Sequence, residues 1–412
     1  MRSIAKYLAL EGNIRVLAVQ TILSQLGFGM LYVVWQPYIL STGVSVAELG
    51  VIQSFINLSS ASGLLAWGAL SDRIGRKPVI LLSNASRVAA LLALIVSGNF
   101  LFLLVFALLV GFSALFMIGN PARSALVSES VDRGRRATAF GTLMSVSQIT
   151  NTITASAGGY LAVRAGYHPI FYICIAGDVI GLILMVLFIE ETHVGRTGDV
   201  KTESMAARLA GFLRPESGMG AFYLIMVVMG VGFTTGYSLL YGFLTDSYGF
   251  TPFQLGLLST TFNLTWGVSS IPLGRLADRF GRSLMLRVSW AMSLITVLGF
   301  LTFRRFEMLL LFQVTSALDP ALWIPAWMSL ISDKVPSRGL STVMGKLDAY
   351  MKLVSIPAPW LGGLLYSNFG LSAPLTVHLG CLIVGGVLVF SINEPGENGD
   401  RQDPAPSGVS LD

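Results

Sequence analysis

Long apolar stretches recur along the chain and limit it to one class of fold. Twelve runs of about 20 residues, each long enough to cross about 30 Å of hydrocarbon as a helix, lie between Ile14 and Ile392. Hydrophobic residues make up 53% of the 412 residues and charged residues only 12%, which is too little polar surface for a water-soluble domain of this size. We therefore predict an all-α membrane protein with twelve transmembrane helices. The predicted spans are 14–40, 46–70, 78–97, 100–127, 137–163, 168–189, 219–244, 252–276, 283–303, 306–331, 340–366 and 372–392.

Basic residues are concentrated on one side of these spans. The two termini and the even-numbered connections hold most of the Lys and Arg, whereas the odd-numbered connections hold only Arg164, Arg304 and Arg305. Because basic loops stay in the cytoplasm, we predict a multi-pass protein of the plasma membrane with both termini cytoplasmic. This topology also explains the formal charge of +5.

Several classes of function find no support in the sequence. The basic residues flank the membrane instead of gathering on one face with aromatic residues, so nucleic acid is not an expected partner. Cys174 and Cys381 lie in apolar spans with no His or Cys at a metal-ligand spacing, and we expect neither a metal nor a cofactor. A nucleotide-binding loop, a zinc helix and a nucleophile elbow are also lacking, so an enzyme is not expected.

A charged loop occurs twice in the chain. The second copy follows the first after 206 positions, and matches at the ends of the fourth and tenth spans have an offset of 204, so that Glu129 corresponds to Asp333. Parallel repeats with a near-constant offset predict two pseudo-symmetric six-helix bundles. The first copy consists of Gly68, Asp72, Arg73, Gly75 and Arg76, and the second of Gly274, Asp278, Arg279, Gly281 and Arg282.

A polar segment divides the predicted helices six and six. We assign residues 1–190 to the N-terminal bundle and 219–393 to the C-terminal bundle, joined by a cytoplasmic linker at 191–218. The linker contains either an interfacial helix or a plain tether. Residues 394–412 are rich in Pro, Gly, Asp and Ser without an apolar period, which predicts a disordered cytoplasmic tail.

The repeated loop resembles the G-x-x-x-D-R-x-G-R-[KR] pattern of the major facilitator superfamily, which here runs from Gly68 to Lys77. The resemblance covers residues 5–393 through helix count, linker position and both loops. It implies that Asp72 docks on the start of helix 11 and Asp278 on helix 5, closing the cytoplasmic side. It also implies that helices 1, 4, 7 and 10 line a central cavity. Glu129 and Asp333 are predicted to pair with the arginines of their own halves.

Three ionisable residues fall near mid-membrane in the second half. Asp319 lies about 20 Å from the cytoplasmic end of helix 10, and Lys352 about 18 Å into helix 11. Asp348 precedes Lys352 by one helical turn on the same face. Because intramembrane charges tend to be paired and functional, we predict that these groups meet and that Asp319 exchanges protons in competition with Lys352. The alternative is a static ion pair that holds helices 10 and 11 together.

The first half carries other charges. Arg87 and Asp178 lie at similar depth on peripheral helices, which favours a structural pair. Arg123 lies on a helix that the resemblance places at the cavity, so it either attracts an anionic group or reaches back to the cytoplasmic interface. Polar and aromatic residues at mid-depth either line the cavity or make helix-packing contacts. These candidates are Gln25, Trp35, Asn57, Gln148, Asn151, Tyr237, Tyr241, Asn263, Trp323 and Tyr350.

The predicted function is secondary active transport of a small molecule by alternating access, by a monomer that uses the proton gradient. Export of an amphipathic or drug-like compound is favoured, and a proton symporter or uniporter for a sugar or other metabolite is the alternative. A membrane receptor or scaffold without transport is a more remote one. The family's antiport pattern G-P-x-x-G-G is incomplete in helix 5, which has Thr154 to Gly159, and a similar run in helix 11, Pro357 to Gly363, stands at the repeat-related position.

Overall fold

A computed structural model describes residues 8–113, 120–192, 214–216, 218–335 and 340–390. Within these ranges every predicted span is a helix or a pair of helices, and none of the described residues forms a strand. Eight of the helical segments are long and apolar enough to cross a membrane. Most of the predicted linker and the whole predicted tail lie outside the described residues, so those two boundaries stay predictions.

The first half of the chain forms one bundle. Its fourth span is described as two helices, α5 and α6, on either side of residues 114–119. The helices are α2 (Gly12–Ser41), α3 (Val46–Ile74), α4 (Arg76–Ile95), α5 (Phe100–Ser113), α6 (Pro121–Glu129), the 3-10 turn η1 (Arg133–Arg135), α7 (Arg136–Ala165) and α8 (His168–Phe188).

The second half forms the other bundle, and two of its spans are broken. The seventh span consists of α10 and α11, and the eleventh of α15 and α16, where Pro357 and Pro359 withhold backbone donors from a continuous helix. The helices are α10 (Gly220–Tyr237), α11 (Leu240–Tyr248), α12 (Pro252–Phe280), α13 (Arg282–Thr302), α14 (Phe306–Lys334), α15 (Leu340–Val354), α16 (Ala358–Phe369) and α17 (Ser372–Phe390).

The internal repeat extends to the ends of the second and eighth spans. Ser45 and Glu48 form a capping box at the start of α3, and Thr251 and Gln254, 206 positions later, form one at the start of α12. Both helices end at a glycine with positive φ, 103° at Gly75 and 90° at its repeat counterpart. A side chain disfavours this backbone conformation, so the glycine fixes the reversal into the next helix.

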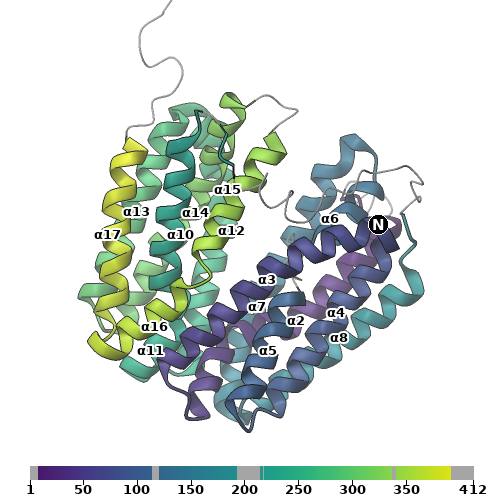
Figure 1. The fold of residues 1–412 in the computed structure, drawn as a ribbon, viewed down its shortest axis with the longest axis horizontal. Coiled ribbons are helices and arrows are strands. Elements are labelled where there is room, and N and C mark those ends of the chain that lie inside the picture. Colours follow the sequence, from purple (N-terminus) through teal and green to yellow (C-terminus); the bar gives the residue numbers. More distant parts are fainter. Residues whose placement is uncertain (1–7, 114–119, 193–213, 217, 336–339, 391–412) are drawn as a thin grey trace, which may run out of the picture.

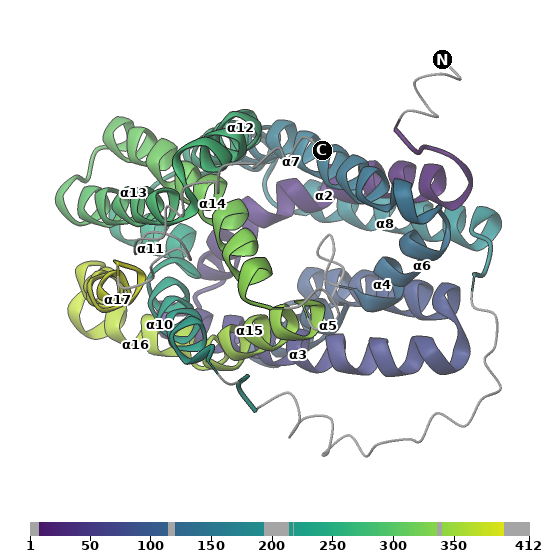
Figure 2. The same cartoon turned by 90° about the horizontal axis from the view of Figure 1, so that it is seen from above.

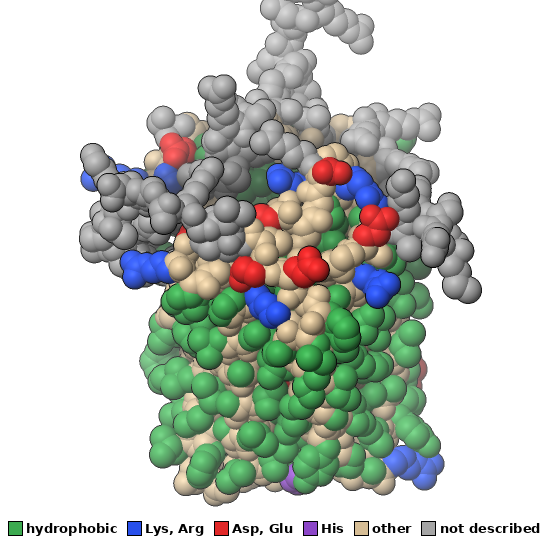
Figure 3. Space-filling view, turned by 90° about the vertical axis from the view of Figure 1, so that its right-hand side faces the viewer, with side chains coloured by type: hydrophobic (Ala, Val, Ile, Leu, Met, Phe, Trp, Pro, Cys, Tyr) green, Lys and Arg blue, Asp and Glu red, His purple; other side chains and the backbone are tan. Residues whose placement is uncertain are grey.

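The two bundles meet at one end and diverge toward the other (Figure 1). Two seams join them, α3 against α16 and α7 against α12, and Figure 2 shows the second seam along one edge of the molecule. The charged loop between α3 and α4 lies at the diverging end. In Figure 3, most Lys, Arg, Asp and Glu side chains gather toward this end, above a broad apolar belt. Such a belt fits a bilayer that surrounds the bundles.

Four glycines bring the seams into close contact. A Cβ atom built on Gly50 or Gly256 would lie 2.6 Å from the carbonyl oxygen of Pro359 or Ala155, respectively. One on Gly159 would lie 2.2 Å from that of Pro252. One on Gly363 would lie 2.7 Å from the carbonyl oxygen of Val46. Helix backbones therefore touch directly at all four points, an approach that only glycine permits.

These contacts obey the internal repeat. Gly50 and Gly256 are 206 positions apart, and Gly159 and Gly363 are 204 apart. The partner residues follow the same offsets, because Pro359 stands 204 positions after Ala155. The two seams are therefore copies of one another. Gly363 on α16 occupies the same place in the α3–α16 seam that Gly159 on α7 occupies in the α7–α12 seam.

Candidate functional site

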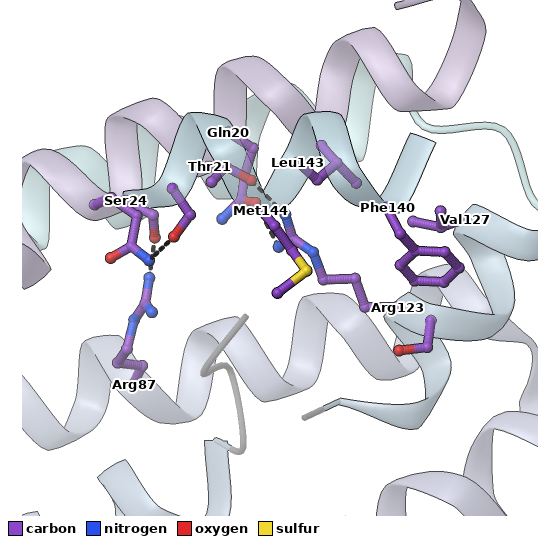
Figure 4. Close-up of a pocket in the computed structure, with 12 residues that line it drawn as sticks. Gln20, Thr21, Ser24, Arg87, Arg123, Val127, Phe140, Leu143 and Met144 are labelled. Atoms are coloured by element: carbon purple, nitrogen blue, oxygen red, sulfur yellow. Dashed lines mark hydrogen bonds between the residues drawn. The ribbon is translucent and has the colours of Figure 1, made fainter. Parts of the chain in front are cut away.

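A pocket opens among α2, α4, α6 and α7 of the first bundle (Figure 4). One part of its wall is polar and comes mainly from α2. The other part is apolar, and its residues on α7 include Met144, whose side chain is 41% exposed. The lining residues are Gln20, Thr21, Ser24, Gln25, Arg87, Arg123, Ser124, Val127, Phe140, Leu143, Met144 and Ser147.

Arg123 is the cation at the centre of this pocket. Asn120 caps the start of α6 through its side chain, and Pro121 follows at the first helical position, so Arg123 is held in the first turn. Its guanidinium donates to Gln20 Oε1 at 2.7 Å and to Thr21 Oγ1 at 2.5 Å. The residue is 9% exposed. It therefore turns inward to α2, and the predicted alternative of reaching the interface is not observed.

Arg87 and Asp178 form the predicted pair between α4 and α8. The Arg87 Nε donates to Asp178 Oδ2 at 2.7 Å, and its Nη2 forms an ion pair with Oδ1. The hydroxyl of Ser24 bonds to both groups. Because both charges are buried, each compensates the other, and the pair joins three helices of the first bundle.

Asp319 is the carboxylate inside the second bundle. Unlike Asp178, it has no cationic partner among the described side chains. Its carboxylate accepts hydrogen bonds from the hydroxyls of Ser289 and Ser293 on α13. The Tyr237 ring on α10 lies within electrostatic range of this carboxylate, and no hydrogen-bond partner of the Tyr237 hydroxyl is described.

The predicted meeting of Asp319 with Lys352 and Asp348 is not observed. Asp348 and Lys352 interact with each other one turn apart on α15, and both are exposed. Asp319 instead faces α13. Depth along the membrane is similar for the three groups, but Asp319 bonds to α13 while Asp348 and Lys352 are exposed, so the predicted single cluster is not formed in this conformation.

Four of the predicted cavity residues form contacts at or near the seams. Asn57 Nδ2 donates to the carbonyl of Ser355, which lies in the break between α15 and α16, at 2.7 Å. Gln148 Nε2 donates to Asn263 Oδ1 across the second seam at 2.8 Å. Tyr241 packs edge-on against Tyr32 of the other bundle, with ring centroids 6.1 Å apart. These side chains join the bundles in this conformation.

Gln36 is a further bridge that the sequence did not single out. Its amide donates to the carbonyl of Ser238 and accepts from the backbone of Gly242, both at 2.8 Å. Ser238 lies in the break between α10 and α11, where carbonyl groups lose their helical partners. Amide side chains of the first bundle thus satisfy the backbone at both broken helices of the second.

The remaining cavity candidates lie within single bundles. Trp35 and Trp323 are each 8% exposed and pack against Phe106 and Trp327, respectively, so they lie in the cores, as the helix-packing alternative has it. Tyr350 packs edge-on against Tyr223. Gln25 donates to Ser147 at 2.6 Å and lines the pocket, and Asn151 lies beside Gly29.

The loop between α3 and α4 is held within its own half. Arg76 bonds to Asp72 at 2.6 Å and to Glu129 at 3.2 Å, so the predicted Glu129 pair is present. Glu191 accepts from the backbone of Arg76 and Lys77 at 3.0 and 2.9 Å, which caps the start of α4. The Asp72 side chain is 68% exposed, and no bond from it to α15 is described.

Other members of the predicted gate are less informative. Arg73 is exposed, and Gly68 lies in ordinary contact with Pro121. The side chains of the repeat-related loop fall outside what the structure describes, so their predicted contacts stay predictions. These are the side chains of Asp278, Arg279, Arg282 and Asp333. Of the two glycines of this loop, Gly274 has nothing within 4 Å of the position that a Cβ atom would take, and Gly281 ends α12.

Sequence reasoning missed several residues that complete these sites. Gln20 and Thr21 hold Arg123, and Ser289 and Ser293 hold Asp319. Serine and threonine are common in membrane helices and usually bond to their own backbone, so residue type alone does not distinguish them. A usable signal was the spacing of Ser289 and Ser293, which lie one turn apart on one helical face.

Comparison with known proteins assigns this architecture to a family. The sequence profile of the Major Facilitator Superfamily matches residues 17–242 and 221–410. The chain belongs to the Major Facilitator Superfamily. This confirms the family prediction and, with the described helices, the predicted fold of two six-helix bundles in a membrane.

Relatives with similar sequences include proteins named for multidrug resistance. The multidrug resistance protein MdtG of Salmonella typhi is 24% identical over 353 residues, which cover 84% of this chain and 86% of that protein. The MdtG protein of Salmonella paratyphi B matches equally. The chain is thus similar to these proteins over most of its length.

Solved structures of the superfamily share the fold. A variant of the nucleoside transporter NupG superposes with a TM-score of 0.73 at 13% identity, covering 92% of this chain and 98% of the other. A bacterial homolog of the human lysosomal transporter Spinster gives 0.72 at 15% identity, with 93% and 96% covered. The human organic anion transporter MFSD10 gives 0.63 at 19%, with 92% and 98% covered. At these identities the likeness concerns the fold alone.

Proposed function

We propose that the chain is a proton-coupled exporter of amphipathic or drug-like compounds across the plasma membrane. The observation that carries this proposal is the pair of glycine seams, which hold the bundles together at one end while they diverge at the other (Figure 1). Such an arrangement is one state of an alternating-access cycle. In this proposal the diverging end, with the basic loops, faces the cytoplasm, and the sealed end faces outward.

The seams are suited to repeated opening. Their closest contacts are between helix backbones at the four glycines, which interlock less than packed side chains do. The polar bonds across the seams, such as Gln148 to Asn263, involve neutral groups that water can replace on either side. Opening the outer end would then accompany docking of Asp72 on α15 at the inner end.

Asp319 is the proposed proton carrier. A carboxylate in a membrane bundle without a cation is costly while charged, and protonation removes that cost. Two serine hydroxyls hold the group, and both can bond to either protonation state because a hydroxyl donates and accepts. The relatives named as multidrug resistance proteins support export of drug-like compounds as the cargo.

The test is transport by the purified protein in liposomes. We expect an imposed pH gradient to drive accumulation of an amphipathic dye such as ethidium or of an anionic counterpart such as dansyl-aminoundecanoate. The variant Asp319→Asn should lose accumulation against a gradient and keep exchange of labelled for unlabelled compound. Proton-driven accumulation that persists in Asp319→Asn would reject Asp319 as the carrier. Absence of transport for every amphipathic compound, with uptake of a sugar or other metabolite, would reject the exporter.

A further inference from the structure

The pocket of the first bundle carries an uncompensated positive charge. Arg87 and Asp178 neutralise each other, but the described partners of Arg123 are the neutral oxygens of Gln20, Thr21 and the Leu17 backbone. The charged group that acts on Arg123 is Arg87, which has the same sign. Two guanidinium groups therefore lie near one carboxylate, and a cation without an anion inside a membrane bundle is costly.

The shape of the pocket suggests what compensates that charge. Its free volume is about 40 Å³, which suits a head group and not a whole drug-sized molecule. Gln20 and Thr21 lie beside Arg123, and Phe140, Leu143 and Met144 line the same pocket (Figure 4). A ligand with one anionic group and an apolar body would place the first at the guanidinium and the second along the α7 side chains.

Resting on the proposed export of amphipathic compounds, we propose that Arg123 binds the anionic head group of the substrate, so that this transporter selects amphipathic organic anions. Arg123 holds two hydrogen bonds to neutral acceptors, and a carboxylate is a stronger acceptor for the same donors. The hydroxyl of Thr21 and the amide of Gln20 can then turn to donate to the ligand. The head group would restore neutrality in a pocket that the protein leaves positive.

A purely structural role makes a different prediction. If Arg123 only joins α6 to α2, replacing it weakens the fold and lowers the affinity for all ligands alike. If it binds an anion, replacing it removes the preference for charged over neutral ligands. A matched pair of probes separates the two roles, because each probe serves as the folding control for the other.

The experiment measures binding of fluorescent 11-(dansylamino)undecanoate and its neutral methyl ester to the full chain in lipid nanodiscs, corrected for empty nanodiscs. Wild type should bind the acid about tenfold to a hundredfold more tightly than the ester, as expected for hydrogen bonds to a charged group. Arg123→Gln should bind the two probes equally, with the ester unchanged. Arg123→Lys keeps the charge without the paired donors and should retain part of the preference.

The control is Arg164→Gln, which removes the same charge from the exposed end of α7. It should leave the preference for the acid intact. Equal binding of acid and ester by wild type, or an undiminished preference in Arg123→Gln, would overturn the anion site. If Arg123→Gln does not fold, the anion site would be overturned by an Arg123→Lys variant that prefers the acid over the ester as strongly as wild type does. If wild type transports neutral or cationic amphiphiles but does not bind the acid, the anion site is rejected and the proposed exporter is retained.

Discussion

The two bundles share a scaffold but handle buried charge in opposite ways. At the loop offset of 206, Arg87 corresponds to Ser293, and at the offset of 204, Arg123 corresponds to Trp327. In the first bundle Arg87 on α4 pairs with Asp178. In the second bundle Ser293 on α13 bonds to Asp319. The first bundle therefore keeps a surplus cation and the second an unpaired carboxylate among the side chains that the structure describes.

The position of Arg123 shows how the halves diverged. Its counterpart Trp327 stacks on Trp323, with ring centroids 4.7 Å apart, and also packs against Phe222. Aromatic rings thus fill in one bundle the space that holds a polar pocket in the other. The comparison teaches that the internal repeat supplied a shared helical scaffold, while the buried polar groups differ between the two halves.

The largest effect should come from Asp178. Asp178→Asn leaves Arg87 buried without its counter-charge, and we expect a loss of about 3–5 kcal/mol of unfolding free energy. Asp319→Asn, which removes a carboxylate held by neutral hydroxyls, should cost about 1 kcal/mol or less. Denaturant titration of both variants in the same detergent measures the difference. Equal losses would remove the proposed contrast between the bundles.

The seams should respond alike, because the internal repeat relates them. Gly159→Ala and Gly363→Ala each place a methyl group against a carbonyl of the facing helix, and overpacking of about 1–3 kcal/mol should shift the protein toward separation at the sealed end. In a chain without native cysteines, labelling of Ser238→Cys by an impermeant maleimide should become about tenfold faster.

Two other glycines on the helices of the α7–α12 seam provide the control. Gly141 on α7 and Gly267 on α12 have nothing within 4 Å of the position that an alanine methyl group would take, so their alanine variants should label at the wild-type rate. An effect of Gly159→Ala without a similar effect of Gly363→Ala would show that the seams are not equivalent in function.

The smallest effect should come from the exposed loop. Glu129→Gln removes one partner of Arg76 at a position that water reaches, so we expect a loss of about 0.2–1 kcal/mol that fades as salt increases. Denaturant titration at low and high salt checks this. A loss as large as that of Asp178→Asn would mean that the loop pair, like the buried pair, is shielded from solvent.

The sequence predicted those features that depend on length, pattern and repetition. The spans, the matching loops, the Arg87 pair with Asp178 and the Glu129 pair with Arg76 follow from periodicity and from counting positions along helices. Counting gives depth in the membrane but not the direction in which a side chain points. Asp319 and Lys352 have similar depth, yet Asp319 bonds to α13 while Lys352 is exposed.

Other features arise only when helices meet. The breaks between α10 and α11 and between α15 and α16 are stabilised by Gln36 and Asn57 from the opposite bundle, and no local pattern links those residues. The tryptophans Trp35 and Trp323 show the same limit, because an aromatic residue suits a core as well as a cavity. The pocket around Arg123 needed Gln20 and Thr21, which are ordinary polar residues until α6 packs beside them.

The four glycine contacts also constrain how this sequence can evolve. Each glycine touches the main chain of its partner, so trimming the partner's side chain offers no relief if the glycine gains a methyl group. Compensation would require a shift of a whole helix, and that shift would disturb the second glycine of the same seam. Substitutions at these four glycines should therefore be rarely tolerated, while a partly exposed residue of the pocket wall such as Met144 can vary more freely.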